Sequence, residues 1–259
     1  MSARVDLVRD DGIATITLAN DGKLNAGTAQ MWRDLKLAFD GLSGDDSLRC
    51  VIVRGAGEAF AAGGDIGEFA ALRDTLERAR IYHEQWVAPA LHAIRDCLHP
   101  TLAAIRGPCI GGGLEIAGAC DIRLAAGDAR FGAPINKLGF SMAPAELEMV
   151  LGVAGAATAL ELLLEGRIID AAEAHLRGLV GRVADIDAFD DEVAACARRI
   201  AAGAPLVARA HKRLVRRLQK GAPLTEAERA ASFDWLGTED YREGLAAFAE
   251  RRSPAFKAR

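Results

Sequence analysis

The stretch 101-TLAAIRGPCIGGGLEIAGACDIRLAAGDARF-131 combines a strand, a glycine-rich turn and the start of a helix. An apolar run ends at Ile105, three glycines follow at 111–113, and Glu115 lies in the first turn of the predicted helix. Glycine lets the backbone approach a ligand closely, and a helix start leaves N–H groups free and carries a partial positive charge. The stretch therefore predicts a point at which a developing oxyanion would be stabilised.

The glycine triplet at 111–113 could have a role other than binding an oxyanion. The run does not match Gly-x-Gly-x-x-Gly with a downstream acidic residue, and it does not end in Gly-Lys-Ser or Gly-Lys-Thr, so dinucleotide and P-loop sites are disfavoured. Glycine also marks turns and close packing. The residues alone allow either a structural or a ligand-contacting role.

The segments around this stretch alternate between strand and helix patterns. Alternating apolar residues flank Asp10-Asp11-Gly12, which is typical of a hairpin. A further strand is expected at 50–53, between a helix at 28–42 and a long helix at 73–97 that ends before His99-Pro100. This order of elements predicts an α/β fold in which helices cover the sheets.

The C-terminal part of the chain has a different pattern. Beyond residue 187 the strand signals stop, and three amphipathic stretches at 187–202, 205–218 and 224–252 have helical periodicity. We therefore predict two parts, an α/β core at 1–186 and a C-terminal helical oligomerisation region at 187–259, which would pack on the core or on a neighbouring subunit.

Composition excludes several classes of function. The net charge of −4 and pI near 5.8 over 259 residues give no general basic field for nucleic acid or anionic membranes. The first residues lack the apolar run of a signal peptide and no uninterrupted apolar stretch reaches about 18 residues, so a cytoplasmic protein without membrane contact is expected. The five cysteines and five histidines have no metal-ligand spacing, so we predict no metal site and reduced, packed cysteines.

Two glycine-rich segments carry a resemblance to a known family. Residues 60–66, FAAGGDI, resemble the Phe-Cys/Ser-Ala-Gly-Ala/Gly-Asp-Ile/Leu motif of the enoyl-CoA hydratase/isomerase (crotonase) family, and 111–115, GGGLE, resembles its second signature. The likeness extends over nearly the whole chain, through KLNA at 23–26, CDI at 120–122, FGxP at 131–134, KLG at 137–139, LEL at 160–162, GR at 166–167, AAEA at 171–174 and GLV at 178–180.

The resemblance implies a particular architecture and ligand. The family fold is a spiral of strand-strand-helix repeats followed by a C-terminal helical trimerisation region, assembled as a homotrimer or homohexamer. The implied ligand is an acyl-coenzyme A thioester, which is the substrate, and no further cofactor is implied.

The family motifs also imply roles for three residues of the site. The backbone N–H groups of Gly64 and Gly112 would hold the thioester carbonyl oxygen, and Glu115 would be an acid-base group. Donors aimed at a developing oxyanion lower the barrier, and losing one typically costs about 10²- to 10³-fold in rate. A carboxylate beside them can orient water or shuttle a proton.

Contacts to coenzyme A are implied at both ends of the chain. Lys23 and the backbone of Leu24 would border the phosphate and pantetheine path, and the backbone of Gly64, Asp65 and Ile66 would lie near adenine. Phe248 and Arg251 of a neighbouring subunit would face the nucleotide, since a cation suits phosphate and an aromatic ring suits adenine. The alternative is a solvated Lys23 and a Phe248 that packs between helices.

The sequence departs from the family pattern at the second catalytic glutamate. After Phe-Gly-x-Pro this chain has Ile135, which can neither give nor take a proton, and Glu146 appears in a segment that is usually glycine-rich. Either Glu115 works alone with water, or Glu146 completes the site, or the reaction differs. A carboxylate near a helix start is also a common cap or surface charge.

These alternatives define the predicted functions. Hydration of a 2-enoyl-CoA in fatty acid metabolism comes first because Glu115 is retained. Double-bond isomerisation or decarboxylation through the same thioester enolate is the second enzymatic hypothesis. A non-catalytic acyl-CoA-binding protein is the alternative from another class, because of Ile135.

Overall fold

The computed structural model of the chain describes residues 3–259 and begins with the predicted hairpin. Strands β1 (Arg4–Asp10) and β2 (Ile13–Ala19) pair antiparallel, with Asp10 opposite Ile13. Asp11 and Gly12 have φ values of 42° and 73°, the left-handed backbone that a two-residue hairpin turn requires. The predicted hairpin is confirmed.

The hairpin leads into a six-stranded sheet of order β1-β2-β3-β4-β6-β9, parallel from β2 onward. Alternate residues of β3 enter two separate cores, Val51 and Val53 on one face and Cys50 and Ile52 on the other. Both faces are therefore covered, as parallel sheets require. The strands that join the hairpin are β3 (Cys50–Gly55), β4 (Thr101–Ile105), β6 (Ile122–Ala126) and β9 (Arg182–Ala184).

A smaller sheet of order β5-β7-β8 supplies the second strand of each strand-strand-helix repeat of the predicted spiral. The chain passes from β4 directly to β5 (Pro108–Ile110) and helix α5 (Gly112–Ala119), and from β6 to β7 (Arg130–Gly132) and helix α6 (Pro144–Glu165). An isolated bridge pairs Ala61, which follows β3 in the chain, with Cys109 of β5. This bridge extends the small sheet toward the strand-strand-helix repeat that begins with β3. The predicted strand-strand-helix repeats are thus present.

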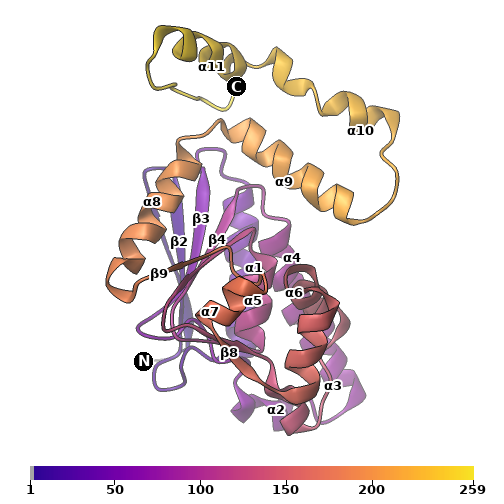
Figure 1. The fold of residues 1–259 in the computed structure, drawn as a ribbon. Coiled ribbons are helices and arrows are strands. Elements are labelled where there is room, and N and C mark those ends of the chain that lie inside the picture. The colour runs from indigo at the N-terminus through magenta and orange to yellow at the C-terminus, as the bar shows by residue number, and fades with distance from the viewer. Residues whose placement is uncertain (1–2) are drawn as a thin grey trace.

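Helices cover the two faces of the large sheet differently. Helices α1 (Ala29–Ser43) and α4 (Ala88–Arg95) lie on one face together with α5 and α6, and α8 (Phe189–Ala201) packs on the other face against β3 and β6 (Figure 1). Thr28 caps α1 as predicted, accepting from the N–H of Met31. The shorter elements are η2 (Pro134–Leu138), β8 (Ile168–Asp170), α7 (Ala171–Leu176) and η3 (Ile186–Ala188).

The long helix predicted at 73–97 is present over residues 76–95, with a π-helical segment in its middle. The segment contains α3 (Leu76–Arg80), a π-helical segment η1 (Ile81–Val87) and α4, and a separate helix α2 (Ile66–Leu72) precedes them. Thr75 accepts from the N–H of Arg78 and so caps the start of this helix, which the apolar periodicity placed near Arg73. π-Helical turns occur frequently at functional sites.

The C-terminal helices leave the body after α8. Helix α9 (Pro205–Gln219) is held to it by Asp121, which pairs with Lys212 at 2.7 Å and Arg216 at 3.0 Å. The third predicted stretch, 224–252, is divided into α10 (Glu226–Ala231), η4 (Asp234–Gly237) and α11 (Glu239–Glu250), which project beyond α9 (Figure 1). Because α8 packs on the sheet, the division at 186/187 stays a prediction.

Helix α6 is long and apolar enough to cross a membrane by length and composition. Its conformation breaks at Gly155, where φ is 69°. Met149, Val150 and Leu162 of this helix are buried in the main core, and α6 packs against α5. One third of its most apolar stretch is buried, and Leu160 and Leu164 are 54% and 72% exposed, so α6 packs on the body with one side only.

Candidate active site

A cavity of about 160 Å³ lies where the two glycine-rich segments meet α2, η1 and α6. Its wall includes Gly64, Gly112 and Glu115, the three residues with predicted catalytic roles. Ile135 and Glu146 line the same cavity, so the departures from the family pattern face the predicted site. The structure therefore brings together residues that are up to 82 positions apart in the sequence.

The backbone around Gly64 is fixed by a short bridge to Gly27. The N–H of Gly27 donates to the carbonyl of Gly63 at 2.7 Å, and the N–H of Asp65 donates to the carbonyl of Gly27 at 2.9 Å. Gly63 has φ of 100°, which only glycine adopts readily. Among residues 3–259, no backbone carbonyl accepts from the N–H of Gly64, which leaves that donor available at the cavity.

Gly112 provides a second available amide. It is the first residue of α5, so its N–H has no carbonyl partner within the helix, and the partial positive charge of the helix start lies there. A β-carbon built on Gly112 would lie 3.5 Å from the carbonyl carbon of Gly63, and the N–H of Ile110 donates to the carbonyl of Ala61 at 2.9 Å, so the two segments lie side by side. The predicted convergence of the two amides at one cavity agrees with this packing, while their role in catalysis stays a prediction.

An aromatic wall fixes both glycines in place. The indole N–H of Trp32 donates to the Tyr82 hydroxyl at 3.2 Å. A β-carbon on Gly112 would lie 3.1 Å from the Trp32 ring, and one on Gly64 would lie 3.0 Å from the Phe69 ring. Trp32 and Tyr82 were missed in the sequence because they lie in separate helices, outside the family motifs.

Glu115 is buried at the cavity with 6% of its surface exposed. Its carboxyl forms no hydrogen bond to any other of residues 3–259. Burial raises its pKa well above the ordinary value, the charge of Glu146 adds to the rise, and Arg73 opposes it. Burial therefore favours the protonated form of this side chain, which can donate a proton, over its carboxylate.

The pH dependence of stability tests this burial. A carboxyl with a raised pKa in the folded state stabilises the fold below the ordinary value of 4.5, and that contribution is lost as pH rises toward the folded-state pKa. Glu115→Gln mimics the neutral carboxyl at every pH. We therefore expect the variant to melt at a higher temperature than the unmodified chain, by a margin that grows from pH 5 to pH 8. Thermal denaturation across this range measures it, and a constant or reversed difference would contradict the assignment.

Glu146 is a buried cap rather than a surface charge. It has 5% of its surface exposed and lies in the first turn of α6, where one carboxyl oxygen accepts from the N–H of Ala143 at 3.4 Å. The other oxygen bonds Nδ1 of His83 in η1. Sequence reasoning treated the histidines only as metal ligands, and no local signal reveals a contact between residues 63 positions apart.

The residues predicted to contact coenzyme A fall into two groups. Lys23 pairs with Asp65 at 2.6 Å, and Leu24 and Ile66 are 57% and 59% exposed beside Gly64, so these residues form an open surface next to the cavity. The pKa of Asp65 is lowered, mainly by its hydrogen bond from Lys23. Phe248 and Arg251 lie at α11, far from α2 in the same chain (Figure 1), so they would reach a cavity only in another subunit.

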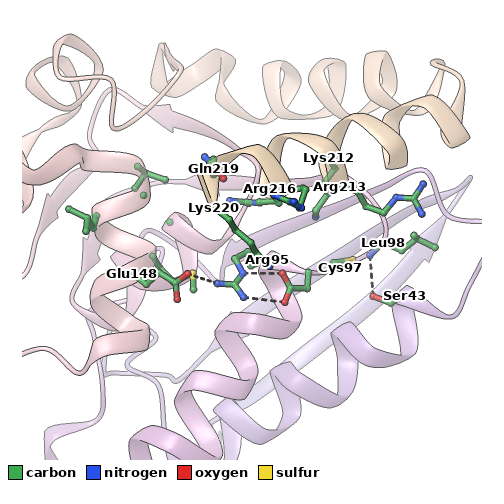
Figure 2. A pocket seen from close by; sticks show the side chains of 17 residues that line it. Ser43, Arg95, Cys97, Leu98, Glu148, Lys212, Arg213, Arg216, Gln219 and Lys220 are labelled. Atoms are coloured by element: carbon green, nitrogen blue, oxygen red, sulfur yellow. Dashed lines mark hydrogen bonds and ion pairs between the residues drawn. The ribbon is translucent and has the colours of Figure 1, made fainter. Parts of the chain in front are cut away.

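A larger cleft of about 750 Å³ lies below α9 (Figure 2). Arg95 at its centre pairs with Asp96 and with Glu148, each at 2.9 Å. None of the predicted catalytic residues lines this cleft, whose charged lining is mostly basic, with Asp96 and Glu148 as its acidic side chains. The smaller cavity is therefore the better candidate.

Metal chemistry has no candidate among the residues that the structure describes. Within residues 3–259, no three His, Cys, Asp or Glu side chains gather as metal ligands would. All five cysteines are buried and free. Burial raises the pKa of Cys50 and of Cys120 to about 12, which makes these thiols poor nucleophiles.

The family model described as "Enoyl-CoA hydratase/isomerase" matches residues 9–259. An enoyl-CoA hydratase/carnithine racemase structure from Magnetospirillum magneticum is 51% identical, with a TM-score of 0.96 over 98% of this chain and 96% of that one. A relative from Mycobacterium bovis named "Probable enoyl-CoA hydratase" is 37% identical over 97% of this chain and 96% of its own. A mitochondrial Delta(3,5)-Delta(2,4)-dienoyl-CoA isomerase from Dictyostelium discoideum is 31% identical over 95% of this chain and 87% of its own.

The spiral of strand-strand-helix turns around a small cavity defines a crotonase-fold enzyme. More specifically, the chain belongs to the enoyl-CoA hydratase/isomerase family. The relatives include both a hydratase and an isomerase by name, so membership of the family does not by itself identify which reaction this chain catalyses.

Proposed function

We propose that this chain hydrates a 2-enoyl-CoA, with the thioester carbonyl oxygen held by the N–H groups of Gly64 and Gly112. The observation that carries the proposal is the contact between these two glycine segments at a cavity that also contains the buried Glu115. Addition of water to the conjugated alkene places negative charge on the carbonyl oxygen. Preorganised amide donors stabilise that charge more strongly in a site without bulk water.

Glu115 supplies a proton in this proposal. Its raised pKa favours the protonated carboxyl, which can transfer its proton to the carbon next to the carbonyl as the enolate collapses. The open surface formed by Lys23, Leu24 and Ile66 would take the rest of coenzyme A, since it combines apolar area with a cation near the cavity.

Double-bond isomerisation is the second candidate, and Ile135 favours it. A single carboxyl that removes and returns a proton can move a double bond through the same enolate, whereas Ile135 supplies no second proton-transfer group. Both reactions use the same amides and Glu115, so the products must distinguish them.

The test is turnover of two substrates by the full chain. We expect crotonyl-CoA to gain the mass of one water, measured by chromatography and mass spectrometry, and 3-hexenoyl-CoA to isomerise more slowly. Rapid isomerisation without hydration would support the second candidate. Binding of butanoyl-CoA without turnover of either substrate would support a non-catalytic acyl-CoA-binding protein.

We further propose that the chain works as a trimer or hexamer. Phe248 is 88% exposed on α11, and Leu245 and Leu236 are also exposed on the projecting C-terminal segment. Such apolar exposure favours contact with a second subunit, where Phe248 and Arg251 could meet its coenzyme A. Light scattering coupled to size-exclusion chromatography tests this, and a monomeric mass at micromolar concentration would contradict it.

A further inference from the structure

His83 occupies an unusual position beside the predicted site. It lies in the π-helical segment η1, its side chain is 17% exposed, and it lines the cavity together with Glu115. Its Nδ1 atom bonds one carboxyl oxygen of Glu146. Its Nε2 atom forms no hydrogen bond to another of residues 3–259.

The contacts of Glu146 indicate which atom of the pair can work on a substrate. One of its oxygens holds Nδ1 of His83 and the other accepts from the N–H of Ala143, so both carboxyl oxygens already have partners. A carboxylate at Nδ1 fixes the tautomer in which Nδ1 carries the proton and Nε2 is an acceptor. The imidazole Nε2 is thus the free proton acceptor of the pair.

We propose that His83 is the general base of this site, oriented by Glu146, and that the pair replaces the glutamate absent at position 135. The inference rests on the proposed hydration. A carboxylate that orients an imidazole and stabilises its charged form is a recurrent device in enzymes that activate a hydroxyl group or water.

The step balances with the groups present. His83 Nε2 takes a proton from water as the oxygen bonds the third carbon of the enoyl chain, and the electrons of the alkene move toward the thioester oxygen. Glu115 then protonates the second carbon, so one water has been added. His83 is left as an imidazolium and Glu115 as a carboxylate, and proton exchange through solvent restores both.

Tyr82, which packs against His83 in η1, is not a second candidate base. The Tyr82 ring lies 5.0 Å from the imidazole in an edge arrangement, and the Tyr82 hydroxyl is already engaged by Trp32. Because burial raises the pKa of Tyr82, its hydroxyl stays protonated and does not compete as a base. Arg73 lies over the Phe69 and Phe140 rings, at 4.1 and 4.2 Å from their centroids.

His83→Asn is the decisive variant. The asparagine amide can occupy the place of Nδ1 and still donate to Glu146, but it has no atom equivalent to Nε2. We expect kcat for crotonyl-CoA hydration to fall by about 10²- to 10⁴-fold, with KM changed only a few fold. His211→Asn, at an exposed site on α9, is the matched control and should behave as the unmodified chain.

Chemical rescue separates a catalytic from a structural role. Added imidazole should restore part of the activity of His83→Ala by entering the vacated space, and it should leave Glu115→Gln unchanged. Glu146→Gln combined with His83→Asn should lose little more than His83→Asn alone, because the two residues act as one unit. Butanoyl-CoA binding and thermal melting of each variant show whether it is folded.

The outcomes distinguish this inference from the proposed function. If the unmodified chain hydrates crotonyl-CoA and folded His83→Asn does so equally well, His83 is not the base although the proposed function stands. Loss of activity without any rescue by imidazole would also overturn the role of Nε2. If the unmodified chain turns over no enoyl-CoA, the proposed function fails and this inference fails with it.

Discussion

Replacing Glu115 with glutamine should lower kcat for crotonyl-CoA hydration by about 10²- to 10⁴-fold, the range typical for loss of a positioned acid. Glutamine has nearly the same shape as the protonated carboxyl but cannot give up a proton to carbon. Because Glu115 is buried at the cavity and forms no hydrogen bond to another of residues 3–259, the substitution breaks no hydrogen bond between these residues. The loss should therefore appear in kcat, with KM nearly unchanged.

The same substitution should separate activity from stability. We expect Glu115→Gln to melt at a higher temperature than the unmodified chain at neutral pH, because a carboxyl that ionises freely in the unfolded chain but not when buried favours unfolding, and yet to be nearly inactive. Steady-state kinetics and thermal melting of the same preparation measure both effects. Glu148→Gln is the matched control because Glu148 pairs with Arg95 outside the cavity.

The result also separates the enzymatic from the non-catalytic hypothesis. If Glu115→Gln retains the turnover of the unmodified chain, Glu115 is not the acid. If both proteins bind butanoyl-CoA and neither turns over an enoyl-CoA, the cavity binds without catalysis. Only a large loss in the variant, with Glu148→Gln fully active, supports the proposed role.

The parts of the fold that sequence could predict are those with short-range causes. The hairpin depends on Asp11 and Gly12, and helix α1 depends on the Thr28 cap, so local patterns were sufficient. The helix predicted at 73–97 is present over 76–95, but its cap at Thr75 and its π-helical turn were not predicted, because the apolar periodicity continues across both. Periodicity indicates which face of a helix is buried, but it does not indicate the residue at which the helix begins or a π-helical turn within it.

The candidate site shows the same division between local and distant causes. The family motifs located both glycine segments and Glu115, and the structure places them at one cavity. The pair formed by His83 and Glu146 could not be predicted, because it depends on how η1 packs against the start of α6. Catalytic roles and the oligomeric state stay predictions, since they concern a bound thioester and further subunits.

Gly113→Ala should be the most damaging conservative substitution near the site. A β-carbon at Gly113 would lie 2.3 Å from the carbonyl oxygen of Ala61, a backbone atom that cannot rotate away. That oxygen accepts from the N–H of Ile110 at 2.9 Å, two residues before Gly112. A methyl group must therefore push apart the two segments that carry the predicted amide donors.

We expect this displacement to affect stability and catalysis together. Overpacking of this kind costs about 1 to 3 kcal/mol or more, and a shift of about 1 Å in a reacting group can cost about 10²-fold in rate. Gly152→Ala is the matched control, because a β-carbon there meets nothing within 4 Å and alanine favours the helix by up to about 1 kcal/mol. Chemical denaturation and crotonyl-CoA kinetics should show Gly113→Ala impaired in both and Gly152→Ala at least as stable as the unmodified chain. If Gly113→Ala were as stable and active as that control, the close packing of the two segments would not be what positions the amides.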